Sequence, residues 1–222
     1  MPAFDWGYIW EAVPDLLDGL VVTIYVSFLA ILLSLTVGAI GCALRVADHK
    51  ILSFPVAGYV EFIRGTPFLV QVFFIFYGLP SLGLTLSAFW SGVVALTVWA
   101  SVFHIESFRA GLSAVGKEIQ NASASLGLRS WQHTLFVVLP IATRSALPSS
   151  LNTIVATIKN SAYLQAIGLV ELTFVAVDRI AYDFRSTEMF LAICLIYLAV
   201  VLLVSAAGHR LERRLNRPYV GR

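Results

Sequence analysis

The sequence predicts an all-α membrane protein with five transmembrane helices and one long polar loop between the third and the fourth helix. Of the 222 residues, 59% are hydrophobic and 13% are charged, whereas a soluble domain usually carries about 25% charged residues. Several uncharged stretches also reach the length of about 20 apolar residues that crosses a bilayer. We expect a chain of this length to form a single domain, over residues 1–222.

The first helix is expected between two polar segments. Residues 1–18 are mixed and hold tryptophan and tyrosine side chains, which favour a membrane surface. No residue from Gly19 to Leu44 is charged, so this stretch predicts the first span. Gly38 and Gly41 either allow another helix to approach closely or only make this helix more flexible. A polar loop over residues 45–55 follows.

The next two spans come from one uncharged stretch of about 41 residues, from Gly65 to Ile105, which is long enough for both. Turn-forming residues at Gly78-Leu79-Pro80 divide it. The second helix should therefore end near Tyr77, and the third should run from about Ala88 to Ile105.

The rest of the chain predicts a long loop and two further spans. The loop covers about residues 106–144. The apolar stretch of residues 146–177 predicts a fourth span that is broken at Lys159-Asn160-Ser161. A short charged loop over residues 178–188 and a last span over residues 189–207 complete the expected order.

The basic residues orient these spans, because lysine and arginine favour the cytoplasmic side of a membrane. The opposite side holds only Arg179 and Arg185, and residues 1–18 hold no basic residue. We therefore expect the N-terminus outside, and the long loop and the C-terminus in the cytoplasm. The basic residues on the expected cytoplasmic side are Arg45, Lys50, Arg109, Lys117, Arg129, Arg144, Arg210, Arg213, Arg214, Arg217 and Arg222.

A polar stretch inside the long loop, residues 119–140, predicts a short helix, a corner and a second short helix. Gly127 suits the end of the first helix, because glycine takes a positive φ at little steric cost. Ser130 can cap the second helix, which should end at Leu139-Pro140. The alternative is a plain amphipathic loop that links two membrane helices. The residues that shape the corner are Ala122, Ser123, Leu126, Gly127 and Leu128.

The spacing of this stretch resembles the EAA loop of ABC importer permeases, in which Glu-Ala-Ala is followed by Gly and then by Ile-x-Leu-Pro. Asn121 stands where the family has Glu, and Ser123 replaces the second Ala. In that family the loop is a coupling helix that docks on a cytoplasmic ATPase. The resemblance implies that role for Asn121, Ala122, Ser123, Leu126, Gly127, Leu128, Leu139 and Pro140.

A second stretch resembles the polar amino-acid permeases of the histidine, glutamine and arginine uptake group. The matching residues are Glu61, Arg64, Gly65, Thr66, Pro67 and Gln71. From this resemblance we expect Glu61, Arg64, Gly65, Thr66 and Gln71 to contribute to substrate binding.

Charge and backbone chemistry give this stretch a physical interpretation as well. Glu61 and Arg64 lie on one helix face, and ionisable groups within a membrane usually face a partner or a water-filled cavity. They either pair with each other or bind the ammonium and carboxylate groups of a zwitterion. Pro67 breaks the helix and frees backbone groups that Thr66 or a ligand can satisfy.

Lys159 and Asn160 mark the second broken place and are expected at the substrate site. The family pattern here is Lys-Asp-Thr-Ser-Leu, of which this chain keeps Lys159. The Lys159 ammonium can pair with Glu61, contact a substrate carboxylate or extend to the membrane surface.

The chain is expected to have no enzyme activity and no cofactor of its own. Gly111, Gly116 and Lys117 have the spacing of a phosphate-binding loop, but Glu118 stands where a magnesium-binding hydroxyl belongs. We therefore expect ATP and Mg to bind to a partner ATPase.

The predicted function is the membrane permease subunit of an ATP-driven ABC importer for polar amino acids, in a bacterial inner membrane. The resemblance implies a second permease subunit, two cytoplasmic ATPases and an extracytoplasmic binding protein. Asn121 favours a second permease that differs from this one. Besides these proteins and the lipid bilayer, we expect no nucleic acid partner. The alternative is an ATP-independent secondary transporter or channel for small polar solutes.

Overall fold

The computed structural model describes residues 4–47 and 49–216, and every regular element in those residues is a helix. Here η1 and η3 are π-helices, and η2 and η4 are 3₁₀-helices. The elements are α1 (Trp6–Val46), α2 (Lys50–Arg64), α3 (Phe68–Phe73), η1 (Phe74–Gly78), η2 (Leu79–Leu82), α4 (Ala88–Ser113), α5 (Lys117–Ser125), α6 (Ser130–His133), η3 (Thr134–Val138), α7 (Leu139–Asn160), η4 (Ser161–Ile167), α8 (Leu172–Asp183) and α9 (Ser186–Asn216).

The long helices agree with the predicted all-α membrane fold. Four helical stretches of the described chain are long and apolar enough to cross a membrane, namely Trp6–Val46, Ala88–Ser113, Ser130–Ile167 and Ser186–Leu215. The bent pair of Lys50–Arg64 and Phe68–Leu82 supplies a fifth span when it is counted as one.

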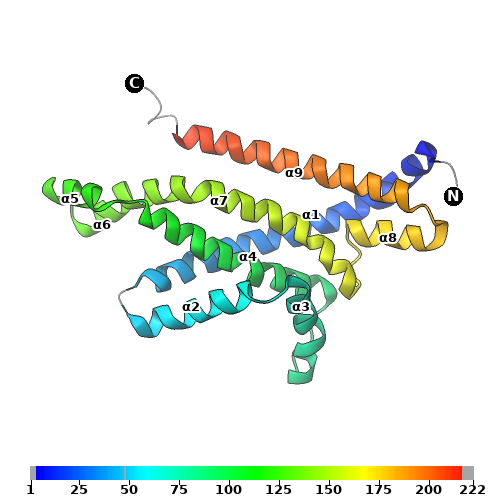
Figure 1. The fold of residues 1–222 in the computed structure, drawn as a ribbon, viewed down its shortest axis with the longest axis horizontal. Coiled ribbons are helices and arrows are strands. Elements are labelled where there is room, and N and C mark those ends of the chain that lie inside the picture. The colour runs from blue at the N-terminus through cyan, green and yellow to red at the C-terminus, as the bar shows by residue number, and fades with distance from the viewer. Residues whose placement is uncertain (1–3, 48, 217–222) are drawn as a thin grey trace.

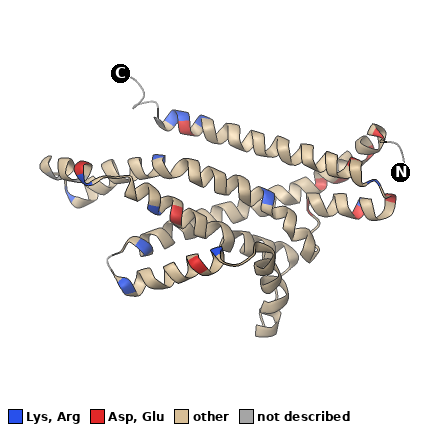
Figure 2. Ribbon diagram, viewed as in Figure 1, with Lys and Arg blue, Asp and Glu red and all other residues tan. Residues whose placement is uncertain are grey.

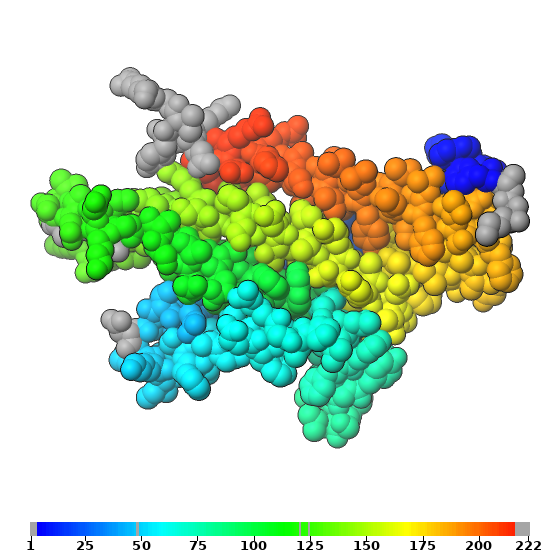
Figure 3. Space-filling view, viewed as in Figure 1, coloured from blue at the N-terminus to red at the C-terminus, as the bar shows by residue number. Residues whose placement is uncertain are grey.

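The long helices run side by side along one axis (Figure 1). α4 lies between α1 and α7, and α9 packs on α7 and α8. α8 lies at the end of the molecule near the N-terminus, whereas α5 and α6 lie at the opposite end. α3, η1 and η2 leave the bundle as an arm, which also stands out in the space-filling view (Figure 3).

Small residues bring α1, α4 and α7 close together. A Cβ atom placed on Gly38 would lie 2.5 Å from the Cβ of His104, and one on Gly41 would lie 2.6 Å from the Cδ1 of Ile105. A Cβ atom on Gly111 would clash with the carbonyl oxygen of Ala142 on α7. Glycine thus permits close helix contacts, as membrane helices require, and the close-approach prediction for Gly38 and Gly41 is confirmed.

The end of the bundle at α8 is joined by one buried carboxylate. Glu171 is fully buried and caps α8, accepting hydrogen bonds from the backbone N–H groups of Thr173 (3.0 Å) and Phe174 (2.8 Å). It also accepts hydrogen bonds from the hydroxyl groups of Tyr197 on α9 (3.0 Å) and Thr23 on α1 (3.4 Å). These bonds satisfy the carboxylate and tie three helices together.

The break predicted at Pro67 is confirmed, because the chain bends by 108° between α2 and α3. Pro67, which has no backbone N–H, directly precedes α3 at the bend. Two predicted helix ends in the first half of the chain are wrong. The second helix was expected to end near Tyr77, but helical turns continue through η2 to Leu82. The third helix was expected to end at Ile105, but α4 continues to Ser113 because polar residues at a helix end can extend beyond the apolar span.

Two expectations in the second half are also wrong. The charged loop expected over residues 178–188 is largely α8, which Glu171 caps and which continues to Asp183. The second short helix was expected to end at Leu139-Pro140, but the helix runs without a bend from Ser130 to Ile167. Pro140 is tolerated because it occupies the second position of α7, after a π turn.

Both π turns stand directly before a Leu-Pro pair. The N–H of Leu79 donates to the carbonyl oxygen of Phe74, and the N–H of Leu139 donates to that of Thr134, each five residues back. Proline lacks an N–H and its ring crowds the preceding turn, so a wider turn relieves the crowding. This arrangement lets α6 continue into α7 through a proline.

The Gly111 contact can be tested with two glycine-to-alanine variants. Gly111→Ala should destabilise the protein by about 1–3 kcal/mol, the usual cost of overpacking, because its methyl group meets a backbone carbonyl that cannot rotate away. Gly58→Ala is the matched control, since no atom lies within 4 Å of its added Cβ. Thermal unfolding of the purified chain in detergent measures both, and equal midpoints would contradict the close contact.

Candidate functional site

The bend between α2 and α3 is held by side chains from its own sequence. The hydroxyl of Thr66 donates to the carbonyl oxygen of Phe62 at 3.0 Å. The amide nitrogen of Gln71 donates to the carbonyl oxygens of Ile63 (2.9 Å) and Thr66 (3.1 Å), and to the Thr66 hydroxyl (2.9 Å). The N–H of Gly65 donates to the carbonyl oxygen of Glu61 at 2.9 Å. Thr66 and Gln71 therefore satisfy much of the backbone that the break frees.

Gln71 also keeps one buried atom for another partner. Its side chain is 8% exposed, and its Oε1 atom has no hydrogen-bond partner in the described chain. A buried acceptor without a partner is costly unless a ligand or water satisfies it. Gln71 therefore offers an acceptor beside the bend.

Aromatic rings from three elements meet at Phe68, the first residue of α3. The ring of Phe68, on α3, lies 5.9 Å from that of Trp99, on α4, and 5.9 Å from that of Tyr163, on η4. The ring of Phe103 lies 4.7 Å from that of Trp99. We call Phe68, Trp99, Phe103 and Tyr163 the aromatic cluster. No local pattern in the sequence predicts this cluster, because hydropathy does not place α3 against η4.

The charged residues expected at the site are not joined to one another. Glu61 and Arg64 are exposed on α2, and neither forms an ion pair or side-chain hydrogen bond in the described chain. Lys159 is exposed near the end of α7, about one turn before Tyr163, and it does not pair with Glu61. Asn160 is the last residue of α7. Lys159 is thus close to Tyr163 of the aromatic cluster. Glu61 and Arg64 lie on α2, before the bend, whereas Phe68 and Gln71 lie on α3, after it.

The predicted corner is present at the opposite end of the bundle. α5 ends at Ser125, Gly127 adopts a φ of 72°, and α6 begins at Ser130. Arg129, and not Ser130 as expected, is the residue that precedes α6, and its N–H donates to the side chain of Gln132 at 2.9 Å. We call residues 117–133 the elbow.

The elbow presents some of the expected coupling residues and buries one. Asn121, Ala122 and Leu126 are exposed, and Leu128 is half-buried. Ser123 is buried, and its hydroxyl lies 2.7 Å from the Nδ1 atom of His133 on α6. Leu139 and Pro140 lie at the start of α7, beyond the π turn η3.

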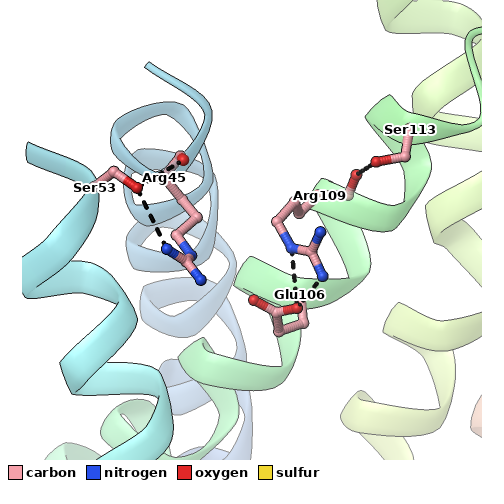
Figure 4. A network of polar contacts seen from close by, with 5 residues as sticks. All are labelled: Arg45, Ser53, Glu106, Arg109 and Ser113. Atoms are coloured by element: carbon pink, nitrogen blue, oxygen red, sulfur yellow. Dashed lines mark hydrogen bonds and ion pairs between the residues drawn. The ribbon is translucent and has the colours of Figure 1, made fainter. Parts of the chain in front are cut away.

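Further polar contacts lie at the elbow end of the bundle (Figure 4). Arg109 on α4 forms an ion pair with Glu106 at 2.7 Å, and Ser113 donates to the Arg109 carbonyl oxygen at 3.0 Å. Arg45 on α1 donates to the Ser53 hydroxyl on α2 at 3.3 Å. Figure 2 shows that most lysines and arginines gather at this end. In the described residues, no group of three or more histidines, cysteines or acidic residues has the arrangement of a metal site.

Comparisons with known proteins agree on one family. The family described as binding-protein-dependent transport system inner membrane component matches residues 30–217. The chain is 33% identical over 215 residues to the glutamine transport system permease protein GlnP of Escherichia coli (strain K12), covering 96% of this chain and 98% of that protein. It is 34% identical over 220 residues to the probable amino-acid ABC transporter permease protein PatM of Vibrio harveyi, covering 98% and 99%.

A solved structure has the same fold. The crystal structure of an amino acid ABC transporter with histidines matches this chain with a TM-score of 0.89 at 30% sequence identity. The match covers 96% of this chain and 100% of the other. The overall arrangement of the helices is therefore that of a solved chain of similar length.

The role of Gln71 in the bend can be tested by stability. Gln71→Leu removes the amide that donates to the buried carbonyl oxygen of Ile63 and to the carbonyl and hydroxyl oxygens of Thr66, which should cost about 1–3 kcal/mol. Val70→Ala is the control on the same helix, because Val70 is 55% exposed. A thermal unfolding midpoint for Gln71→Leu as high as that of Val70→Ala would show that the bend does not depend on the amide.

Proposed function

We propose a role in transport from one premise: this chain belongs to the family of inner membrane components of binding-protein-dependent transport systems. It is the permease subunit of an ABC importer and a multi-pass inner membrane protein, and ATP hydrolysis belongs to a separate partner subunit. A substrate-binding subunit completes such a system. A secondary transporter or channel that works alone would not need either partner.

The substrate that the site supports best is a polar amino acid. The observation that carries this proposal is the unsatisfied Oε1 atom of Gln71, which is on the same short helix, α3, as Phe68 of the aromatic cluster. Tyr163 of that cluster lies about one turn after Lys159. The amide oxygen of Gln71 can accept a hydrogen bond from a substrate ammonium group. The exposed ammonium group of Lys159 can bind a carboxylate, and the rings can pack on the rest of the molecule. The relatives named above are glutamine and amino-acid permeases.

Glu61 and Arg64 have a different place in this proposal. They lie on α2, before the bend, and are exposed without a partner in the described chain. Ionisable groups in membrane helices usually face water or a partner. We assign them to the path between the site and the elbow end of the bundle.

Charge and shape support the orientation and the partners in this proposal. Most basic residues lie at the elbow end (Figure 2), which supports a cytoplasmic elbow and C-terminus and an external N-terminus. The exposed elbow supports docking on a cytoplasmic ATPase, with two ATPases serving two permeases. The exposed apolar arm supports contact with a second permease subunit, and Asn121 in place of Glu supports one that differs from this chain.

Coupling would then run through one helix. Closure of the ATPases on ATP moves the elbow, and α6 is continuous with α7 up to η4, which holds Tyr163. A protein changes state only when a ligand binds the two states with different affinity. ATP supplies that difference here, and the substrate site responds at the far end of α7.

A charged side chain at position 127 tests whether the elbow couples the permease to its ATPase. Gly127→Asp should abolish substrate-stimulated ATP hydrolysis and uptake while the chain stays inserted, because a carboxylate between Leu126 and Leu128 must lose water on docking. Gly127→Asn is the matched control, since asparagine tolerates the same positive φ without a charge. The assay uses vesicles with the partner ATPase and the binding protein. Unchanged stimulation in Gly127→Asp would remove the docking role.

Charge at the substrate site gives a separate test. Lys159→Gln should raise the substrate concentration for half-maximal uptake by about tenfold or more, because a hydrogen bond to a charged group contributes about 1.5–3 kcal/mol. Lys50→Gln, at the start of α2, should leave it unchanged. Labelled amino acids taken up by the reconstituted complex provide the measurement. The same half-maximal concentration for both variants would exclude Lys159 from the site.

A further inference from the structure

We propose that Ser123 and His133 form a clasp that fixes the angle of the elbow and so couples the ATPase to α7. The proposal rests on the proposed function, because it assumes that the elbow docks on an ATPase. Ser123 and His133 are positioning residues in it. Ser123 is only 5% exposed, so its side chain is turned toward α6 and not toward a docking partner.

The corner needs such a contact because its backbone bonds are weak. The N–H of Leu126 donates to the carbonyl oxygen of Ala122 at 3.2 Å. The N–H of Leu128 donates to the carbonyl oxygen of Ser123 at 3.5 Å, which is long for such a bond. α5 packs mainly against α6 among the described elements. The bond between the Ser123 hydroxyl and the His133 Nδ1 atom, at 2.7 Å, is much shorter and links the two helices directly.

The chemistry of the pair suits a permanent bond. A hydroxyl both donates and accepts, so it can donate to a neutral imidazole or accept from a protonated one. An alanine at position 123, as in the EAA pattern, has no group that can make this contact.

The position of His133 lets the clasp pass movement from α5 to α7. His133 is the last residue of α6, and the helix continues through η3 into α7 without a bend. α7 in turn is held against α4 by the Gly111 contact and by a hydrogen bond between the hydroxyls of Ser107 and Ser149, at 2.7 Å. Movement of α5 is therefore passed through the clasp to a helix that reaches Tyr163.

The test measures how many ATP molecules are hydrolysed per substrate imported. Ser123→Ala and His133→Ala should each raise this ratio by roughly two- to tenfold, the effect expected for one ordinary hydrogen bond. The double variant should be no worse than either single one, because both remove the same bond. Ser125→Ala is the matched control, since the Ser125 hydroxyl bonds only within α5, to the Asn121 carbonyl oxygen at 3.0 Å.

The outcomes separate this proposal from the one it rests on. Wild-type protein without substrate-stimulated ATP hydrolysis would overturn the proposed function itself. A coupled wild type with unchanged ratios in Ser123→Ala and His133→Ala would overturn only the clasp, as would additive effects in the double variant. A variant that folds poorly loses hydrolysis and uptake together, so an unchanged ratio in the folded fraction also counts against the clasp.

Discussion

The contact between α4 and α7 is the constraint on which the other features depend. Lipid chains are as apolar as leucine, so membrane helices associate by close packing and not by hydrophobic burial. Gly111 allows α4 to reach the backbone of α7 at Ala142 and Ala146. With α7 fixed on α4, the aromatic cluster at one end and the elbow at the other are held by a single helix.

Proline has opposite effects at the two places that matter for this arrangement. Pro67 follows Gly65 and Thr66, and the chain bends sharply there, with Gln71 satisfying the freed carbonyl groups. Pro140 follows a π turn, and the helix continues. The bend leaves the Gln71 Oε1 atom without a hydrogen-bond partner in the described chain, and the continuous helix reaches from the elbow to η4. The same residue type thus accompanies both a break and a connection.

Hydropathy predicted the spans well, and local chemistry predicted the corner at Gly127 and the break at Pro67. The continuity through Pro140 was not predictable, because a proline in the first turn of a helix and one that ends a helix look alike in sequence. α8 was not predicted because the charged side chains of Asp178 and Arg179 indicated a loop. The residue that caps this helix, Glu171, is held by hydrogen bonds from α1 and α9, which a local pattern does not show. The aromatic cluster joins residues far apart in the chain, which no local pattern reveals.

The π turn before Pro140 has a consequence for how related chains diverge. A π turn is one extra residue accommodated in a helix, and one residue corresponds to roughly 100° of rotation about the helix axis. Because the wider turn absorbs that residue, removing one residue from Thr134–Val138 and restoring ordinary winding would leave the side chains of α6 facing as they do now relative to α7. The π turn thus lets related chains differ in length by one residue at this point without turning α6 away from its present direction.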